Sequence, residues 1–269
     1  MSHPEVIING QRDSQISSFD RGLAYGDGVF ETIAVKQGKL IFWDDHLNRL
    51  IHGCDVLGIG GLDYNLLKSE VLSTISAKED CVIKIIITRG VGGRGYKPEK
   101  NTHTRIIQKH PWPEHSEKLD QQEIEITQCA FRISRQSALS QIKHLNRLEQ
   151  VLARSEWEDE FQDGLVCDTN ENIIEGTSSN VFFECDNNLI TPDLTHCGIE
   201  GVMRKKIIEY CLANKISLEI RDFKLSEINS IRGILLCNSI MGIRQVRTYC
   251  GRELDNTAII NRLITAFNH

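Results

Sequence analysis

The middle of the sequence holds a segment that suits neither a helix nor the interior of a sheet. Residues 110–117 (His-Pro-Trp-Pro-Glu-His-Ser-Glu) contain two of the chain's five prolines and show little apolar periodicity. Because proline removes a backbone donor and interrupts regular structure, we interpret residues 110–119 as a linker between domains. A length of 269 residues leaves room for about two domains, each with its own core. The sequence therefore predicts an N-terminal α/β domain over residues 1–109 and a C-terminal domain over residues 120–269.

Strand and helix patterns alternate before this segment. β-Branched runs are typical of buried strands, and apolar residues at three- and four-residue spacing indicate a helix. The expected elements are a strand at 6–8 that enters a turn at Asn9-Gly10, a hairpin of 30–35 with 40–43, a helix over 47–57 and a strand over 81–88.

The part after the linker mixes strands and helices without a regular βαβ alternation, so a doubly wound parallel sheet is not expected. We predict a mixed α+β fold. The expected elements are a strand at 123–127, a helix after Lys143, paired strands around 168–172 and 187–188, a helix starting near Gly201, a strand at 233–239 and a closing helix.

Composition narrows the class of protein. A net charge of -6 and a pI near 5.9 do not fit a nucleic-acid partner, and no apolar run approaches the roughly 20 residues that span a bilayer. The first residues lack the pattern of a signal peptide, so we expect a cytoplasmic protein. The nine cysteines are scattered singly and form no Cys-x-x-Cys pair. They are interpreted as reduced, mostly buried thiols and not as disulfides or metal ligands.

Two motifs are set aside. Residues 90–95 match the G-x-G-x-x-G dinucleotide pattern, but Tyr96-Lys97-Pro98 follows where a helix should receive the pyrophosphate. We expect a flexible glycine loop that presents Arg94. Residues 168–172 are rich in Asp and Asn, yet Ile173 stands where a calcium loop needs glycine. A turn between strands is the simpler interpretation.

Lys143 is the most informative single residue. It precedes an amphipathic helix and has apolar neighbours, and a lysine in such surroundings loses its proton more easily than a solvated one. A neutral amine is what Schiff-base chemistry requires. A surface lysine at the start of a helix is the commoner occurrence. A catalytic role for Lys143 is therefore supported only by residues elsewhere in the chain.

Several segments, taken together and in order along the chain, resemble the class IV aminotransferases, the fold-type IV pyridoxal-phosphate enzymes. They are residues 26–32, 46–50, 143–147, 174–180, 198–204 and 237–239. The resemblance implies a fold-type IV structure of two domains, with pyridoxal 5'-phosphate at their interface and the C-terminal domain as its binding domain. It also implies a homodimer.

The resemblance carries roles to individual residues. Lys143 would bind the cofactor covalently, and Glu175 would keep the ring nitrogen protonated, which strengthens the ring as an electron sink. A guanidinium suits the cofactor's phosphate, and so do amides at the start of a helix. The expected phosphate-binding residues are Arg49, Thr177, Ser178, Val202, Met203 and Ser239.

Within that family, residues 91–96 and 142–152 are most similar to members that convert 4-amino-4-deoxychorismate to 4-aminobenzoate and pyruvate for folate synthesis. The expected catalytic residues are Lys143 and Thr32, whose hydroxyl would pass a proton to the leaving enolpyruvate. Arg94 and Asn238 are expected to bind the substrate. A D-amino-acid or branched-chain aminotransferase is an alternative, because Glu31 also occurs in those enzymes. A non-catalytic protein that binds the cofactor is another.

Overall fold

The computed structural model describes residues 5–12, 15–98, 103–113 and 124–267. The chain forms two compact units, Met1–Pro113 with Ile142–Asn146 and Glu114–Gln141 with Arg147–His269. The segment that carries Lys143 thus groups with the first unit, although it follows the predicted linker. Residues 114–119 of that linker lie outside the described residues, so the linker and its boundaries stay a prediction.

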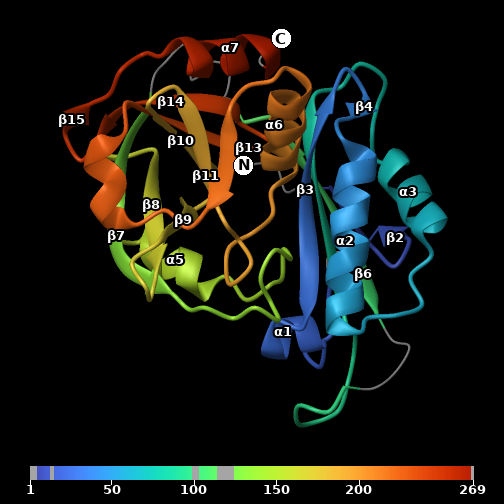
Figure 1. Ribbon diagram of the computed structural model, residues 1–269. Helices are drawn as coiled ribbons and strands as arrows, with labels where there is room; N and C mark the ends of the chain where they lie inside the picture. Colours follow the sequence, from blue (N-terminus) through green and yellow to red (C-terminus); the bar gives the residue numbers. More distant parts are fainter. Residues whose placement is uncertain (1–4, 13–14, 99–102, 114–123, 268–269) are drawn as a thin grey trace. The chain divides into compact units, whose positions relative to one another are not determined.

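The first unit is built on an antiparallel sheet with helices packed on it (Figure 1). In the described residues its strand order is β2-β1-β6-β5-β3-β4. The elements are β1 (Glu5–Ile8), β2 (Gln11–Arg12), α1 (Arg21–Tyr25), β3 (Gly28–Lys36), β4 (Lys39–Leu40), α2 (Trp43–Leu57), α3 (Tyr64–Leu72), β5 (Cys81–Thr88) and β6 (Thr104–Pro111).

The two faces of this sheet differ, because side chains alternate along a strand. Val29, Ile33 and Ile85 are among the buried residues that pack with α2 and α3 into one core. Phe30 and Thr32 lie between them on β3 and belong to the opposite face, where both are only half-buried.

Most predicted elements of this unit are confirmed, including the strand at Cys81–Thr88 with the same bounds. The hairpin prediction was wrong at its end, since β4 stops at Leu40 and Trp43 already begins α2. Phe42 takes a left-handed φ of 52° and turns the chain. Asp44 and Asp45 lie in the first turn of α2, where their negative charges stabilise the helix by interacting with the positive end of its dipole.

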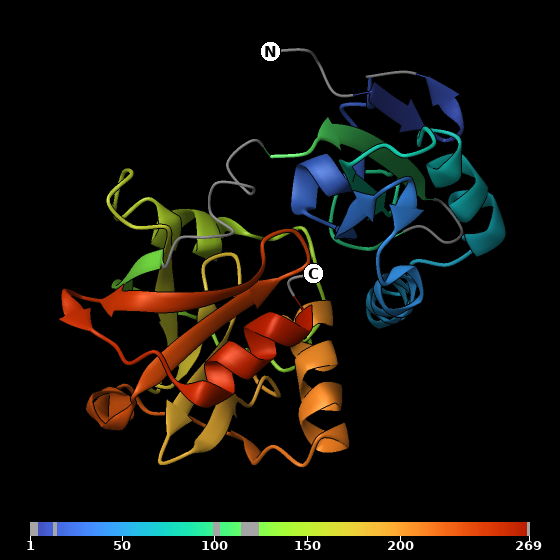
Figure 2. The same ribbon diagram turned by 90° about the horizontal axis from the view of Figure 1, so that it is seen from above.

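The second unit contains a larger, mixed sheet, in the strand order β12-β11-β10-β13-β14-β7-β8-β9, with β15 paired to β14. β9 also contacts β10 and β11, so the sheet curls toward itself. Figure 2 shows α6 and α7 side by side. The elements are β7 (Ile124–Ile133), α5 (Leu148–Arg154), β8 (Asp163–Asp168), β9 (Ile173–Gly176), β10 (Asn180–Cys185), β11 (Asn188–Pro192), α6 (Val202–Ala213), β12 (Leu218–Arg221), η1 (Leu225–Ser230), β13 (Gly233–Asn238), β14 (Gly242–Tyr249), β15 (Arg252–Glu253) and α7 (Ala258–Phe267).

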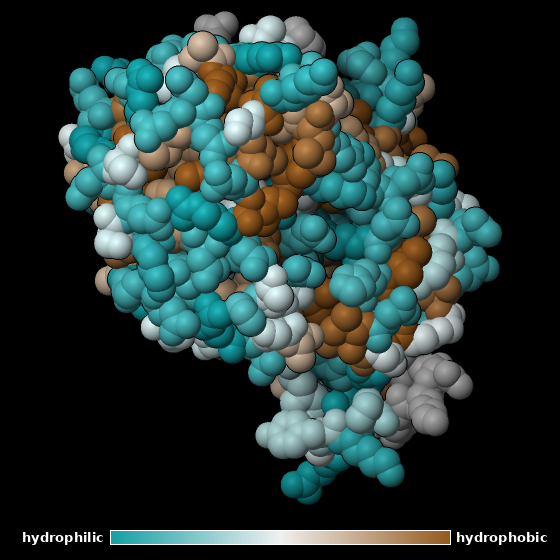
Figure 3. All heavy atoms as spheres, in the orientation of Figure 1, coloured by the Kyte–Doolittle hydropathy of each residue, from teal (hydrophilic) through white to brown (hydrophobic). Residues whose placement is uncertain are grey.

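One hydrophobic core of the second unit includes the stacked rings of Phe183 and Phe223, whose centroids are 4.1 Å apart. Seven of the nine cysteines are buried, which confirms their predicted environment, while Cys250 is exposed. The face drawn in Figure 3 mixes hydrophilic and hydrophobic side chains. Within the described ranges, no helix combines the length and apolar character needed to cross a membrane.

Candidate active site

Lys143 is held against the beginning of β3. The amide of Phe30 donates to the carbonyl of Lys143 at 2.9 Å, and the amide of Leu145 donates to the carbonyl of Gly28 at 2.9 Å. The side chain then turns onto an aromatic ring, with Nζ 4.5 Å from the ring centroid of Phe30. Lys143 is therefore positioned by backbone pairing and aromatic packing, as a lysine with a defined task would be.

A second ammonium group reaches the same ring. Lys84 lies directly opposite Thr32 in the β3–β5 pairing, and its Nζ is 5.5 Å from the centroid of Phe30. Phe30 and Thr32 are two residues apart on one strand and share a face of the sheet. The half-buried face thus combines a hydroxyl with two cations around one ring.

Arg49 lies on α2 and is held by a buried carboxylate that the sequence analysis did not assign. Its Nε and Nη2 donate to Glu31 at 2.7 and 2.6 Å, and Nδ1 of His46 lies 2.6 Å from the same carboxylate. Burial raises the pKa of Glu31, but Arg49 and His46 outweigh it and lower the pKa to about 2. The forked contact fixes the plane of the guanidinium, as expected of an arginine that recognises phosphate.

The contribution of Glu31 should depend on pH. Its pKa falls from an ordinary 4.5 to about 2 on folding, so the stabilisation is present above about pH 4.5 and is lost as pH falls toward 2. We expect Glu31→Gln to lower the free energy of unfolding by about 3 kcal/mol near neutral pH. Urea unfolding of the wild-type protein and of Glu31→Gln can be measured from about pH 7 to 3. The difference between their free energies of unfolding should become smaller below about pH 4.5. A gap independent of pH would contradict this account.

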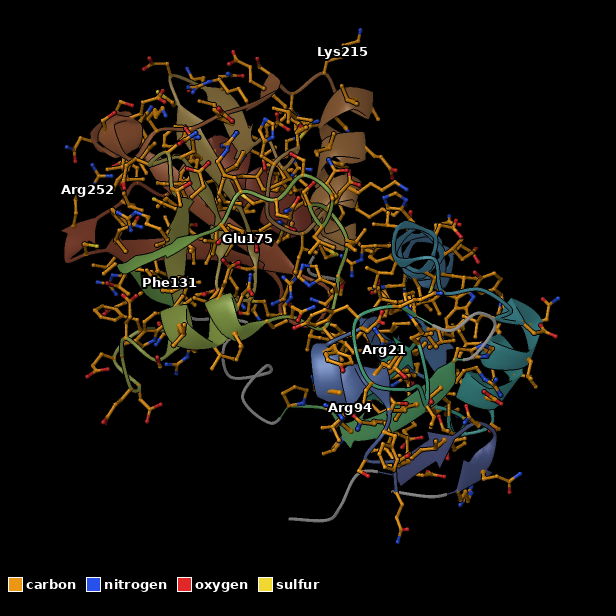
Figure 4. The ribbon with its side chains drawn as sticks, turned by 90° about the horizontal axis from the view of Figure 1, so that it is seen from below. Arg21, Arg94, Phe131, Glu175, Lys215 and Arg252 are labelled. Carbon is orange, nitrogen blue, oxygen red and sulfur yellow. The ribbon has the colours of Figure 1, made fainter. Side chains whose placement is uncertain are left out.

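Glu175 lies on β9 in the second unit (Figure 4). It is 4% exposed. Its Oε2 accepts a hydrogen bond from the amide of Ile199 at 2.9 Å. Arg147 is a nearby cation: burial lowers the pKa of Arg147, while the charge of Glu175 acts in the opposite direction. A buried carboxylate with such partners can hold a proton donor such as a ring nitrogen.

The predicted helix start is confirmed at α6, where Val202 and Met203 form the first turn. Among the residues that the structure describes, no side chain caps this end, so the first amides retain their ability to bind an anion. Gly201 before them has no room for a side chain, because a Cβ there would lie 1.9 Å from Oδ1 of Asn180. The backbone at this helix end is thus held close to its neighbours.

Thr177 and Ser178 both contact one buried carboxylate, that of Asp163. Thr177 donates its hydroxyl to Oδ1 of Asp163 at 2.6 Å, and Ser178 donates to Oδ2 at 3.3 Å. A hydroxyl has one proton, so in this arrangement the Thr177 side chain has none left for a phosphate. Asp163 is buried and also accepts from the hydroxyl of Ser179 at 2.8 Å, so it shapes the whole turn. Nothing in the sequence around Asp163 indicates this role.

Asn238 is the last residue of β13, and Ser239 begins the turn that follows. Oδ1 of Asn238 accepts from the amides of Ile240 and Met241 at 2.9 and 2.8 Å, and its amide nitrogen donates to the carbonyl of Ser178 at 3.2 Å. The Asn238 side chain therefore organises the turn beside Ser178. Its predicted role in binding substrate stays a prediction, as does the phosphate contact of the half-buried Ser239.

The predicted residues fall into two groups. Lys143, Thr32, Arg49 and Arg94 belong to the first unit. The second unit holds the remainder, namely Glu175, Thr177, Ser178, Val202, Met203, Asn238 and Ser239. Glu31 and His46 were missed as partners of Arg49, although both lie within the segments that carried the family resemblance.

The residues present fit pyridoxal phosphate. Glu175 offers a buried carboxylate for the ring nitrogen, and the uncapped start of α6 offers amides for the phosphate. Arg49 offers a guanidinium held in one orientation by Glu31. Lys143 offers an amine packed on an aromatic ring. The ring nitrogen, the phosphate and the aldehyde of the cofactor thus each have a counterpart on the chain.

Comparison with known proteins agrees with this chemistry. A model of the amino-transferase class IV family matches residues 28–249. The chain is 33% identical to an aminodeoxychorismate lyase of Vibrio harveyi over 89% of each protein. It is 28% identical to a putative branched-chain-amino-acid aminotransferase of Methanocaldococcus jannaschii, over 95% of this chain and 91% of the other. The crystal structure of 4-amino-4-deoxychorismate lyase from Pseudomonas aeruginosa superposes with a TM-score of 0.92, at 39% identity over 97% of both chains.

Proposed function

Because the chain belongs to the class IV aminotransferase family, we propose that it is a pyridoxal-phosphate-dependent lyase that converts 4-amino-4-deoxychorismate to 4-aminobenzoate and pyruvate. The observation that carries this proposal is the likeness to the Pseudomonas lyase, with 39% identity over 97% of both chains. The enzyme would serve folate synthesis in the cytoplasm and act as a homodimer. Residues 1–109 and 120–269 would form its two domains.

Pyridoxal phosphate supplies an aldehyde that condenses with amines and a ring that stabilises negative charge at the carbon bearing nitrogen. Lys143 would hold the cofactor and, once released, take the proton from that carbon of the substrate. Glu175 would keep the ring nitrogen protonated. Arg49 and the amides of Val202 and Met203 would bind the phosphate, with Ser239 as a further donor.

The chain itself supports a joint role for Lys143 and Glu175. Only Ile142 separates Lys143 from Gln141, whose amide donates to the carbonyl of Gly198 at 2.8 Å. The next residue, Ile199, donates to the carboxylate of Glu175 at 2.9 Å. Along the chain, Lys143 is therefore close to Gln141, which pairs with Gly198. The residue after Gly198 makes the hydrogen bond to the carboxylate of Glu175.

Thr32 is the residue that would distinguish a lyase from a transaminase. Loss of the proton from the substrate lets the enolpyruvyl ether leave and the ring become aromatic, so no keto acid is required as acceptor. The Thr32 hydroxyl, on the sheet face of Phe30 and opposite Lys84, would give its proton to the departing group. Arg94 would bind a carboxylate of the substrate.

An aminotransferase acting on D-amino acids or branched-chain amino acids is the second candidate, supported by the 28% identity to the Methanocaldococcus protein. Supplying the purified protein with 4-amino-4-deoxychorismate and identifying the product distinguishes the two. Formation of 4-aminobenzoate and pyruvate without a keto acid supports the lyase. Amino transfer to 2-oxoglutarate without 4-aminobenzoate would refute it. Binding of the cofactor without either reaction would leave a non-catalytic protein.

Thr32→Val should lower lyase turnover about 100-fold, because general acid catalysis by the hydroxyl is lost while the shape is kept. Thr32→Ser retains the hydroxyl and should keep most of the activity. Stopped-flow detection of 4-aminobenzoate measures both. Equal activity of the valine and serine variants would remove Thr32 from the mechanism.

A further inference from the structure

The glycine loop after β5 is fastened to the segment around α1 on both sides of its tip. The amide of Arg21 donates to the carbonyl of Gly90 at 2.8 Å, and the amide of Gly92 donates to the carbonyl of Phe19 at 3.2 Å. Beyond the tip, the amide of Gly95 donates to the Tyr25 hydroxyl at 3.3 Å. Arg94 lies between these attachments and is exposed. The loop is thus a frame that presents one arginine.

The side chain of Arg21 makes the strongest of these attachments. It is 5% exposed, and its Nη1 and Nη2 donate to the carbonyls of Gly95 and Tyr96 at 2.9 and 3.1 Å. Figure 4 shows Arg21 on α1 and Arg94 on the neighbouring loop. A buried guanidinium bound to the two carbonyls directly after Arg94 restricts the direction in which Arg94 leaves the backbone.

The aliphatic part of the Arg21 side chain also lies close to the loop at Gly92, before Arg94. A Cβ on Gly92 would lie 2.7 Å from Cδ of Arg21, so only glycine permits this approach. The Arg21 side chain therefore contacts the loop before Arg94 and binds it after Arg94. Removing the Arg21 guanidinium should therefore release the loop on both sides of Arg94.

Asp27 anchors this arginine to the body of the unit. Its Oδ2 accepts from Nε of Arg21 at 2.9 Å and from Nε of Arg89 at 2.7 Å. Arg89 in turn donates to the carbonyls of Leu57 and Gly58 at the end of α2. The loop is therefore linked, through one carboxylate and two arginines, to a helix of the core.

We propose that Arg21 is a positioning residue, which holds the glycine loop so that Arg94 meets a carboxylate of the substrate. This inference rests on the proposed function, in which Arg94 binds substrate. Arg21 itself acts through the backbone of the loop and not on the cofactor. Its loss should therefore weaken substrate binding more than the chemical step.

Kinetics of Arg21→Met, Arg94→Met and the double variant test the proposal. Arg21→Met should raise KM about tenfold and change kcat less than about threefold, because a displaced binding group costs affinity first. In the Arg94→Met background the same change should add nothing further. Additive increases in KM would overturn the proposal.

Limited trypsin digestion gives a readout that needs no substrate, because trypsin cleaves after arginine. In Arg21→Met the cleavage after Arg94 should become several-fold faster, since the loop is released. Gly92→Ala should do the same, as its Cβ displaces the Arg21 stem. Unchanged cleavage in both variants would overturn the proposal.

Arg132→Met is the matched control. Arg132 also donates to a carboxylate, Glu171, and to backbone carbonyls including those of Cys129 and Ala130, but in the second unit. It should leave both KM and cleavage after Arg94 unchanged. If the wild-type protein makes no 4-aminobenzoate, the proposed function fails, while the digestion still decides whether Arg21 holds the loop.

Discussion

Lys143→Ala is expected to reduce turnover of 4-amino-4-deoxychorismate by at least about 10⁴-fold, because in the proposed mechanism this one amine would serve both as covalent anchor and as base. The protein should still fold, since the contacts that hold this segment are made by its backbone with Phe30 and Gly28. The visible absorption of covalently bound pyridoxal phosphate should be lost in parallel. Steady-state kinetics and an absorption spectrum measure the two effects.

Lys84 provides a demanding control for the position of the covalent bond. Its Nζ is 5.5 Å from the ring centroid of Phe30, against 4.5 Å for Lys143, so both amines reach the same ring. Borohydride reduction of the loaded enzyme followed by peptide mass spectrometry should find the cofactor on Lys143 alone. A label on Lys84, or activity that survives in Lys143→Ala, would show that the wrong lysine had been chosen.

The fold could be predicted from the sequence where local patterns decide it. The strand at Cys81–Thr88 and the helix start at Val202 follow from a β-branched run and from a glycine before an apolar pattern. The grouping of residues 142–146 with the first unit could not be predicted, because it depends on pairing with β3, more than a hundred residues earlier. A local pattern can indicate a strand, but it does not show with which distant segment that strand pairs.

The candidate site could likewise be predicted only in part from the sequence. Lys143, Glu175 and Arg49 belong to recognisable segments, but the partners that orient them are visible only in three dimensions. Glu31 faces Arg49 because strand alternation turns it toward α2, away from Phe30 and Thr32. Asp163 precedes Thr177 by 14 residues, and its link to the turn depends on the pairing of β8 with β9.

The second large effect is expected at Glu175. Glu175→Gln should lower kcat by about 10²- to 10³-fold, because a neutral amide cannot hold the proton on the ring nitrogen that makes the ring an electron sink. The glutamine carbonyl can still accept the hydrogen bond from the amide of Ile199, now 2.9 Å from the carboxylate. Cofactor binding should therefore persist, which separates this variant from Lys143→Ala.

Glu184→Gln is the matched control for Glu175→Gln. Glu184 is equally buried, at 1% exposure on β10 of the same unit, and its carboxylate binds the hydroxyl of Thr257 at the start of α7. Its replacement should lower the melting temperature, because a buried hydrogen bond to a charged group is weakened, yet leave kcat nearly unchanged. Glu175→Asp keeps the charge and should recover part of the loss. If Glu175→Gln and Glu184→Gln lowered kcat equally, the effect would reflect general destabilisation, and Glu175 would have no specific role at the ring nitrogen.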